Sequence, residues 1–458
     1  MPKLFVLGLD CATPQFLFEQ YLPDLPNFRK IFTAGTYGKL RSTIPAITVP
    51  AWMSMMTSQT PGDLGIYGFR GRRPGTGYQD MFFASSEHVK YQKVWNYLNA
   101  AGIKTGMLSV PLTYPPQPVD GFMVSCFMTP SLESDYTYPP ELKQEIADEI
   151  GEYIFDYANR STEPVDKIIK IIYEMTDKRF KLVKHFIQTK QWDFLMMVEM
   201  GVDRIHHYLW SYVDPQHPKF PGANPYQNCI HDYYVYIDKL FGEIRELLPK
   251  DCAVMVVSDH GAKAMDGVFL INEWLIKQGY LVLKKYPDKV TKLEKCEIDW
   301  PKTKAWAWGG FYSRIFLNVK GRDPEGIVED FTTEREILKQ KLSAITNDQG
   351  KPMKNLVATA AELYSDPQGD VPDLLGFFGD LGWRPGGTVG HNKIYIHEND
   401  TGPDDGVHDW NGVYAMYQPN KQGIGQQEGL SILDIAPTIL NYFNVSIPNN
   451  FKGKIINY

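Results

Sequence analysis

Three apolar runs in the sequence each lead into an aspartate. The runs and their aspartates are residues 4–9 with Asp10, residues 192–200 with Asp203, and residues 253–257 with Asp259. A single aspartate in such a place is most simply a turn residue or a helix cap. Three carboxylates at one edge of a sheet repel one another unless a cation lies between them. We therefore predict that these aspartates share a metal site.

Histidines near two of these aspartates support this prediction. Asp203 and His207 are four residues apart, which puts them on one face of a helical turn. His260 directly follows Asp259, and His408 precedes a short apolar strand. Mixed imidazole and carboxylate ligands suit zinc, with manganese or iron as alternatives. Each histidine taken alone is more often a core or surface residue, and the D-x-x-x-H spacing is common by chance.

A threonine in the segment 44–68 is the candidate nucleophile. We expect Thr48 in the first turn of a helix, where free backbone N–H groups and the helix dipole favour an anion. A hydroxyl that touches a divalent cation there has a lowered pKa and can attack phosphorus. A capping role for Thr48 is the alternative.

Strands and helices alternate along the chain around these residues. The expected strands are 4–9, 106–110, 192–200 and 253–257, and the expected helices are 94–101, 164–189, 233–248 and 431–443. This alternation predicts an α/β fold, a three-layer α/β/α sandwich with a mostly parallel central sheet. Functional groups of such sheets gather at the carboxyl ends of the strands.

We interpret residues 1–458 as one catalytic domain, with residues of about 272–400 forming a cap inserted within it. This stretch is rich in Gly, Pro and Trp and lacks a regular alternation of strands and helices. Its aromatic residues either form a wall for a base or an apolar leaving group, or fill the core of the cap. They include Trp306, Trp308, Phe311 and Tyr312.

Composition excludes several classes of protein. The chain has 47 Lys and Arg against 54 Asp and Glu, a net charge of −7, so we expect no stable nucleic-acid binding. A hydrophobic content of 43% excludes disorder as the main state. The five cysteines show no CxxC spacing. No signal-peptide core is recognisable near the first residues. No stretch has the ~18 consecutive apolar residues that a membrane span needs. We expect a cytoplasmic protein with reduced thiols. The sequence does not indicate an oligomeric state.

Together these motifs resemble the alkaline phosphatase superfamily, and most closely its type I phosphodiesterase/nucleotide pyrophosphatase branch. The matching features, in order, are Asp10, the P-x-x-T-x-P-x-W-x-S-x-x-T segment with Thr48, the Asp203 and His207 pair, the S-D-H-G run 258–261, and His408. The resemblance covers nearly the whole chain, and the ordered set is far more specific than any single motif. It implies an alkaline phosphatase-like fold.

The resemblance also implies two divalent metal ions, zinc with manganese as the alternative. One ion would be held by Asp203, His207 and His408, and the other by Asp10, Asp259, His260 and Thr48. Thr48 would attack the phosphorus of a small phosphodiester or nucleotide and expel an alcohol or nucleotide. A metal-bound water would then hydrolyse the phosphothreonine intermediate.

Substrate-binding residues are less clear, because the sequence departs from the family here. Many relatives hold a phosphate oxygen with an asparagine about twenty residues after the nucleophile, and this chain has arginines there that could substitute. Arg70 and Arg72, with Trp308, are the candidates, although these arginines are equally well explained as solvated surface charges. Asp404 and Asp405 either orient the metal ligands or are loop residues without a role.

The residue type and sequence setting of the candidate nucleophile favour some branches of the superfamily over others. Sulfatases use a C/S-x-P-x-R setting that is absent around Thr48, and phosphoglycerate mutase relatives carry a large domain directly after a serine. A phosphodiesterase or nucleotide pyrophosphatase-like hydrolase is therefore the predicted function. A phosphonate or phosphomonoester hydrolase or a phosphomutase is the alternative, and a metal-stabilised scaffold is the non-enzyme alternative.

Overall fold

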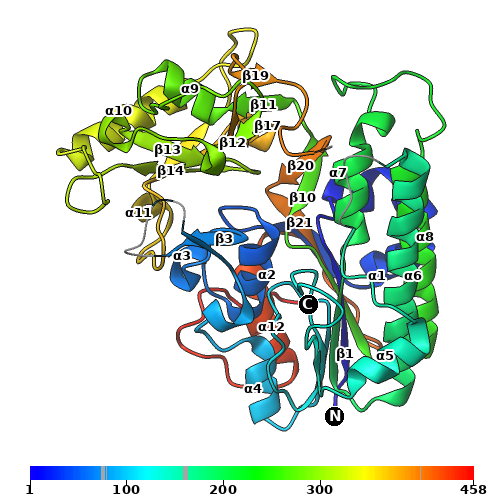
Figure 1. Cartoon of the computed structure of the whole chain (residues 1–458). Helices are drawn as coiled ribbons and strands as arrows, with labels where there is room; N and C mark the ends of the chain where they lie inside the picture. Colours follow the sequence, from blue (N-terminus) through cyan, green and yellow to red (C-terminus); the bar gives the residue numbers. More distant parts are fainter. Residues whose placement is uncertain (74–77, 79, 158–162, 403) are drawn as a thin grey trace.

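A computed structural model of the chain describes residues 1–73, 78, 80–157, 163–402 and 404–458. A nine-stranded sheet forms the centre of the fold (Figure 1), in the order β22-β2-β21-β9-β1-β8-β5-β6-β7. Its strands are β1 (Leu4–Leu9), β2 (Thr36–Arg41), β5 (Thr105–Leu108), β6 (Gly121–Val124), β7 (Thr137–Tyr138), β8 (Phe194–Glu199), β9 (Ala253–Val257), β21 (Asn411–Tyr417) and β22 (Gly425–Ser431).

The sheet is mostly parallel, as predicted. β1 lies between β8 and β9 and is parallel to both, and β5 is parallel to β8 and β6. The exceptions are towards the edges, where β21 runs antiparallel to β9 and β2, and β7 antiparallel to β6. The strands expected over 4–9 and 253–257 are confirmed at their predicted bounds.

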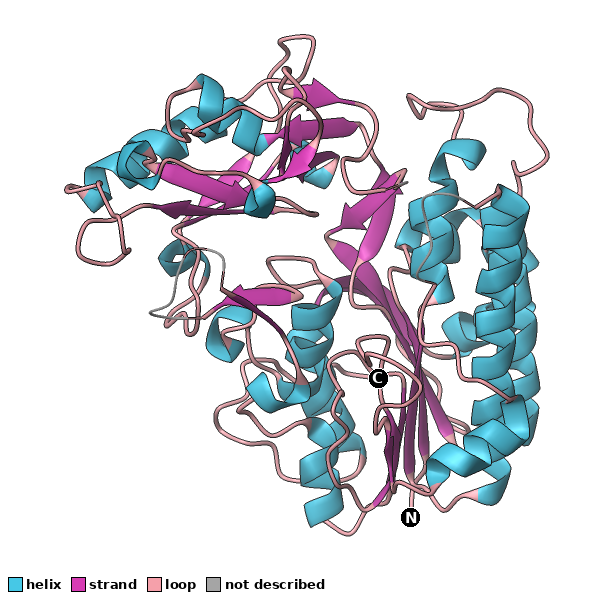
Figure 2. Ribbon diagram, viewed as in Figure 1, coloured by secondary structure: helices cyan, strands magenta, loops and turns pink. Residues whose placement is uncertain are grey.

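Helices cover both faces of the sheet, which gives the predicted three layers (Figure 2). One face carries α1 (Pro26–Ala34), α5 (Leu142–Ile150), α6 (Val165–Thr189), α7 (Gly201–Val213) and α8 (Cys229–Leu247), and the other carries α2 (Thr48–Thr57), α3 (Pro61–Leu64), α4 (Val94–Ala100) and α12 (Ile435–Tyr442). The side chains of β1 alternate between the layers: Phe5 and Leu7 pack with the first set of helices, and Leu4 and Val6 with the second. This alternation follows from the period of two of a strand.

A glycine in β1 brings helix α2 close to the sheet. A Cβ atom at Gly8 would lie 2.6 Å from the indole ring of Trp52, so a larger residue would push the helix away. Trp52 is fully buried, and its Nε1–H donates to Asp10 Oδ2 at 2.7 Å. The close approach thus fixes α2 against the end of β1.

The chain leaves the central sheet after β9 and returns to it at β21. Between these strands, β10 (Gly261–Ala264) and β20 (Gly406–Asp409) pair with each other in antiparallel register. We call the segment between these two strands the insertion. Its strands are β11 (Gly267–Leu270), β12 (Thr291–Lys292), β13 (Ala305–Trp308), β14 (Ser313–Leu317), β15 (Leu356–Ala358), β16 (Leu374–Phe377), β17 (Trp383–Gly386), β18 (Thr388–Val389) and β19 (Tyr395–Ile396), and its helices are α9 (Ile271–Lys277), α10 (Phe331–Ser343) and α11 (Ala360–Leu363).

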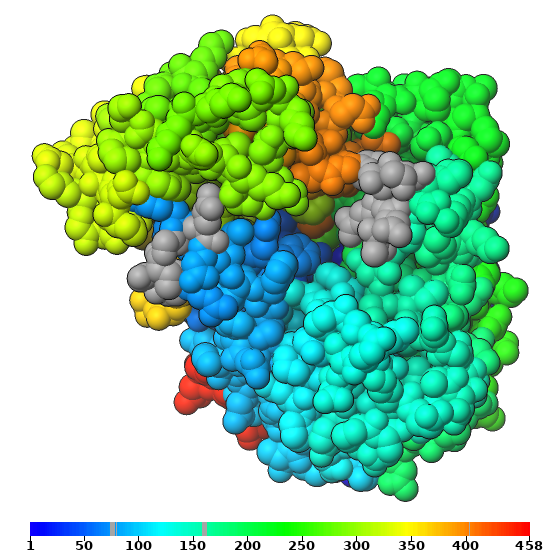
Figure 3. All heavy atoms as spheres, in the orientation of Figure 1, coloured from blue at the N-terminus to red at the C-terminus, as the bar shows by residue number. Residues whose placement is uncertain are grey.

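The insertion builds sheets of its own, the largest with the order β13-β14-β16-β15. Against this sheet lies a hairpin of the N-terminal part, β3 (Arg70–Arg72) with β4 (Met81–Phe83), and the Arg72 guanidinium lies 4.6 Å from the ring centre of Phe316. Figure 3 shows the yellow-green residues of the insertion above the blue residues of the N-terminal segment, with a hollow between them. Within the described ranges, no helix combines the length and apolar character needed to cross a membrane.

Candidate active site

The seven candidate ligands of the metal site come together at the carboxyl ends of β1, β8 and β9. Asp10 follows β1, Asp259 and His260 follow β9, Asp203 and His207 lie in the first two turns of α7, Thr48 begins α2, and His408 lies on β20. Each is at most 5% exposed. The expected position of Thr48 in a first helical turn is confirmed.

One group of these residues surrounds Asp203. His207 Nε2 lies 3.1 Å from Asp203 Oδ1, and the ring of His408 lies 5.2 Å from that of His207. The ligand atoms of Asp203, His207, His408 and Cys11 are all within 4.8 Å of one another. Such a cluster of nitrogen, oxygen and sulfur atoms is suited to a transition metal.

A second group surrounds His260. His260 Nε2 lies 3.1 Å from Asp259 Oδ2, 3.9 Å from Asp10 Oδ1 and 3.3 Å from Thr48 Oγ1. Ligand atoms of Asp10, Asp203 and His260 also lie within 4.8 Å of one another. Asp203 therefore belongs to both groups and lies between them.

The three histidines are held in the tautomer that metal binding requires. The Nδ1–H groups of His207, His260 and His408 donate to the backbone oxygens of Gly406 at 2.8 Å, Gly261 at 3.1 Å and Ala46 at 2.7 Å. In the neutral form of each ring, Nε2 then carries the lone pair that would bind a cation.

Two carboxylate oxygens of the site have no hydrogen bond from the described residues. Asp10 Oδ1 and Asp259 Oδ2 are buried and accept none of acceptable geometry from that part of the chain. Leaving a buried charged oxygen without a partner costs several kcal/mol. A cation between these oxygens removes that cost, so the site fits the metal ions that the residue types imply.

The pKa values describe the same charge imbalance. Burial and the neighbouring Asp203 raise the pKa of Asp10 well above its ordinary value, and burial and Asp10 do the same for Asp259. Burial also acts against ionisation of Asp203, but His207 and the ion-paired Arg204 bring its pKa well below the ordinary value. Burial lowers the pKa of His260 to about 4, which keeps its imidazole neutral. The charge of a bound cation would reverse the shifts of Asp10 and Asp259.

Only one of the two aspartates before His408 contacts the side chain of a candidate ligand. His207 Nδ1–H also donates to Asp404 Oδ1 at 2.6 Å, and Asp404 forms an ion pair with Arg384. The carboxylate of Asp405 instead accepts from the hydroxyl of Ser211 and, at 2.7 Å, from Lys219 Nζ. Asp404 and Asp405 thus have different contacts in the structure, although the sequence alone did not distinguish their roles.

Cys11 is a residue of the site that the sequence analysis did not single out. It directly follows Asp10 with a positive φ of 64°, and its thiol donates to Gly261 O at 3.4 Å. Its position next to Asp10 was the only sequence signal. His206, the neighbour of His207, is fully buried beside Phe16 and donates from Nδ1 to Cys11 O at 3.1 Å.

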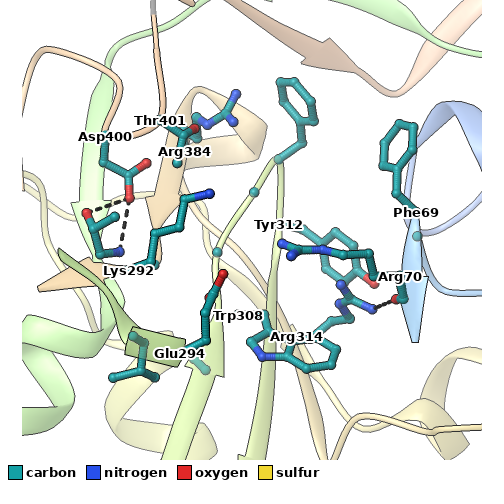
Figure 4. A pocket seen from close by; sticks show the side chains of 18 of the residues that line it. Phe69, Arg70, Lys292, Glu294, Trp308, Tyr312, Arg314, Arg384, Asp400 and Thr401 are labelled. Carbon is teal, nitrogen blue, oxygen red and sulfur yellow. Dashed lines mark hydrogen bonds between the residues drawn. The ribbon is translucent and has the colours of Figure 1, made fainter. Parts of the chain in front are cut away.

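A cavity of about 390 Å³ opens beside the nucleophile candidate (Figure 4). It is lined by Ile47, which precedes Thr48, and by Phe311, whose ring stacks on His408 at 3.8 Å. The predicted substrate-binding residues Arg70 and Trp308 line it, together with Tyr312, Arg314 and Arg384.

Arg72 and Trp306 lie away from this cavity. Arg72 pairs with Asp370 at 3.1 Å, beside a different hollow of the surface, so its expected contact with substrate is not supported by its position. Trp306 is 2% exposed and packs on Phe316 in the core of the insertion. Of the aromatic residues considered in the sequence, Trp308, Phe311 and Tyr312 are those that line the cavity.

Solved structures with a similar fold include ectonucleotide pyrophosphatase/phosphodiesterase 5 and phosphonoacetate hydrolase. Human ectonucleotide pyrophosphatase/phosphodiesterase 5 has 13% identity and a TM-score of 0.58, over 98% of this chain and 96% of that one. An inactive form of the murine protein in complex with AMP has 13% identity and a TM-score of 0.57, over 98% and 97%. Phosphonoacetate hydrolase from Sinorhizobium meliloti, in complex with phosphonoacetate, has 15% identity and a TM-score of 0.62, over 95% and 94%.

These identities are low, so the structural matches establish the fold alone. A comparison with curated proteins found no match. The family described as type I phosphodiesterase/nucleotide pyrophosphatase matches residues 4–404, most of the chain. The protein therefore belongs to the type I phosphodiesterase/nucleotide pyrophosphatase family.

Proposed function

We propose that this protein hydrolyses phosphoric esters, preferably phosphodiesters, with Thr48 as the nucleophile. The observation that carries the proposal is the position of Thr48: its hydroxyl lies 3.3 Å from His260 Nε2, among buried carboxylates, and the preceding residue lines the cavity. Family membership supports a phosphodiesterase or nucleotide pyrophosphatase-like activity.

We further propose that the site binds two divalent cations. Asp203, His207 and His408 would hold one, and Asp10, Asp259, His260 and Thr48 the other. When bound, the ions lower the pKa of the threonine hydroxyl and neutralise charge on the phosphoryl oxygens. Imidazole and carboxylate donors favour zinc, with manganese as the alternative.

The residues of the chain would then act in two steps. Thr48 Oγ attacks phosphorus, the bond to the leaving oxygen breaks, and an alcohol or nucleotide departs from a phosphothreonine. Water then hydrolyses the phosphothreonine and restores the hydroxyl. The first-turn N–H groups of Thr48 and Val49 have no acceptor within α2 and are suited to a phosphoryl oxygen.

We also propose that the chain is one catalytic domain whose segment 272–400 acts as a cap that selects substrates. The cavity beside Thr48 supports this, because its lining comes from both the N-terminal part and the insertion. Ile47 and Arg70 belong to the former, and Trp308 and Arg314 to the latter.

Turnover of chromogenic esters tests the proposed function. Bis(p-nitrophenyl) phosphate and p-nitrophenyl phosphate are compared with zinc or manganese supplied, for the wild type, Thr48→Ala and the matched control Thr48→Ser. We expect faster turnover of the diester and a loss of at least about a thousandfold in Thr48→Ala, because the attacking oxygen is gone. Thr48→Ser keeps the hydroxyl and should retain part of the activity.

Two outcomes would contradict parts of this proposal. Unchanged activity in Thr48→Ala excludes the covalent mechanism, and mass spectrometry of acid-quenched protein tests for the phosphothreonine directly. A preference for the monoester assigns the protein to a phosphatase or mutase activity. Phosphonate hydrolysis is the second candidate because of the fold shared with phosphonoacetate hydrolase; phosphate release from phosphonoacetate would favour it.

A further inference from the structure

We propose that the cavity beside Thr48 binds a second anionic group of the substrate, a carboxylate or phosphoryl group separate from the reacting phosphate, between Arg70 and Arg314. The inference rests on the proposed function only in placing the reacting phosphate at Thr48. It adds a substrate class: phosphodiesters in which the group that stays bonded to phosphorus after the attack carries a negative charge of its own.

The two arginines come from distant parts of the chain and meet at this cavity. Arg70 begins β3 and Arg314 lies on β14 of the insertion, and Arg314 Nη1–H donates to the backbone oxygen of Arg70. The Arg314 guanidinium lies over the ring of Trp308, 4.6 Å from its centre. Figure 4 shows the Arg70 side chain extending into the cavity beside Arg314 and Tyr312.

Neither guanidinium forms a salt bridge with any carboxylate of the described ranges, and both are half-buried. Other arginines of low exposure are paired. These pairs are Arg72 with Asp370, Arg179 with Glu199, Arg204 with Asp156, and Arg384 with Asp404. Burial lowers the pKa of Arg314, and the nearby charge of Arg70 acts in the same direction by repulsion, whereas Tyr312 and Asp370 act in the opposite direction. An anion between them would remove this repulsion.

The remaining charges of the cavity leave its wall positive. Lys292 and Glu294 both line it and are exposed. The carboxylate of Asp400 already accepts hydrogen bonds from the N–H of Thr388 at 3.0 Å and from its hydroxyl at 2.8 Å. Lys292 is an exposed cation, whereas Arg70 and Arg314 are the half-buried cations of the wall that form no salt bridge with a carboxylate of the described ranges.

The cavity can hold both groups of one molecule. Its volume of about 390 Å³ is in the range of small-molecule sites. Ile47 at one side adjoins the nucleophile candidate, and Trp308, Phe69 and Tyr312 supply flat apolar walls for the part of the substrate between the two anions. A guanidinium group binds the oxygens of a carboxylate and of a phosphoryl group equally well. The geometry therefore indicates an anionic group with oxygen acceptors, of either kind.

Three esters with one leaving group test the inference. They are p-nitrophenyl phenyl phosphate, which has no charge apart from that of the diester and is called the uncharged ester, and the same compound with a carboxylate or a phosphate in the meta position of the phenyl ring, called the charged esters. For the wild type we expect kcat/KM to be at least about tenfold higher for a charged ester than for the uncharged one, mainly through KM. The two charged esters distinguish a carboxylate from a phosphoryl ligand.

Variants assign the effect to the two arginines. Arg70→Gln and Arg314→Gln are each expected to lower the preference for the charged ester about tenfold or more, through KM rather than kcat. Arg72→Gln is the matched control: it lies on the same strand, but its guanidinium is already paired with Asp370, so the preference should remain. The ratio of two esters does not depend on the fraction of folded protein.

Calorimetry separates a failure of this inference from a failure of the proposed function. The three esters are titrated into Thr48→Ala, which tests charge preference without turnover. If no ester is turned over by the wild type, the proposed function is wrong, while tighter binding of the charged esters still supports the arginine site. Equal kcat/KM and equal binding of charged and uncharged esters, or a preference unchanged in both arginine variants, would overturn the inference.

Discussion

The seven candidate metal ligands, called the cluster here, and the cavity beside them differ in burial, in charge and in the elements that supply their residues. Each candidate ligand of the cluster is at most 5% exposed, and three of the seven, Asp10, Asp259 and His260, closely follow strands of the central sheet. The cavity has half-buried arginines and aromatic rings, and its key residues lie on β3 and in the insertion. Within the described part of the chain, the cluster has carboxylate oxygens without a hydrogen bond, whereas the cavity has guanidinium groups without a salt bridge.

This difference separates two properties of the proposed enzyme. Changes in the cluster should alter the turnover of every ester by the same factor, because all of them pass through the same reacting atoms. Changes in the cavity should alter the ratio between esters, because only some of them reach its arginines. Each prediction below tests one side of that division.

Removal of divalent ions should have the largest effect. We expect a chelator to lower the turnover of all three esters by at least about a thousandfold while the far-UV circular dichroism spectrum is preserved, because the ions neutralise charge at the reacting phosphate. Zinc or manganese should restore activity. Turnover that persists in protein shown by elemental analysis to be metal-free would contradict this prediction. Unfolding on chelation, with no turnover before it, would favour a metal-stabilised scaffold.

Asp404→Asn should have an intermediate effect. The change removes the charge that orients His207 through its 2.6 Å hydrogen bond, so we expect metal affinity to fall about ten- to a hundredfold. Zinc titration against a competing chelator measures it. Asp405→Asn is the matched control, because that carboxylate binds Ser211 and Lys219. Equal losses in both variants would contradict a role specific to Asp404.

Trp308→Leu should have the smallest effect, and only on the ratio between esters. The ring supports the Arg314 guanidinium at 4.6 Å, a contact worth about 0.5–1 kcal/mol. We therefore expect the preference for charged esters in kcat/KM to fall about two- to fivefold. Trp308→Phe keeps a ring and should retain most of the preference. A uniform loss for charged and uncharged esters would show that Trp308 does not act through Arg314.

The core of the fold was predictable because its strands are buried on both faces. Such strands appear as continuous apolar runs, so β1 and β9 could be placed at their bounds. The same runs located Asp10 and Asp259, since a residue after a parallel strand lies at the functional edge. His408 was a candidate from its residue type, but its assignment as a metal ligand came from the family resemblance, because no long apolar run precedes it.

The cavity could not be predicted in the same way. Arg70 and Arg72 are two residues apart on β3, so both face the insertion, and nothing local distinguishes them. What distinguishes them is Asp370, far along the chain, which pairs with Arg72 alone. Arg314 depends likewise on where the insertion is folded against β3, and no short-range pattern reports such a contact.

The return of the chain after the insertion has a consequence for how the protein folds during synthesis. β21 pairs with β9, yet the whole insertion separates them in the sequence. Until β21 has been synthesised, β9 presents an open strand edge, which is a template for aggregation. Long-range pairing of this kind slows folding much more than it lowers final stability. The central sheet can therefore be completed only after the whole insertion has been synthesised.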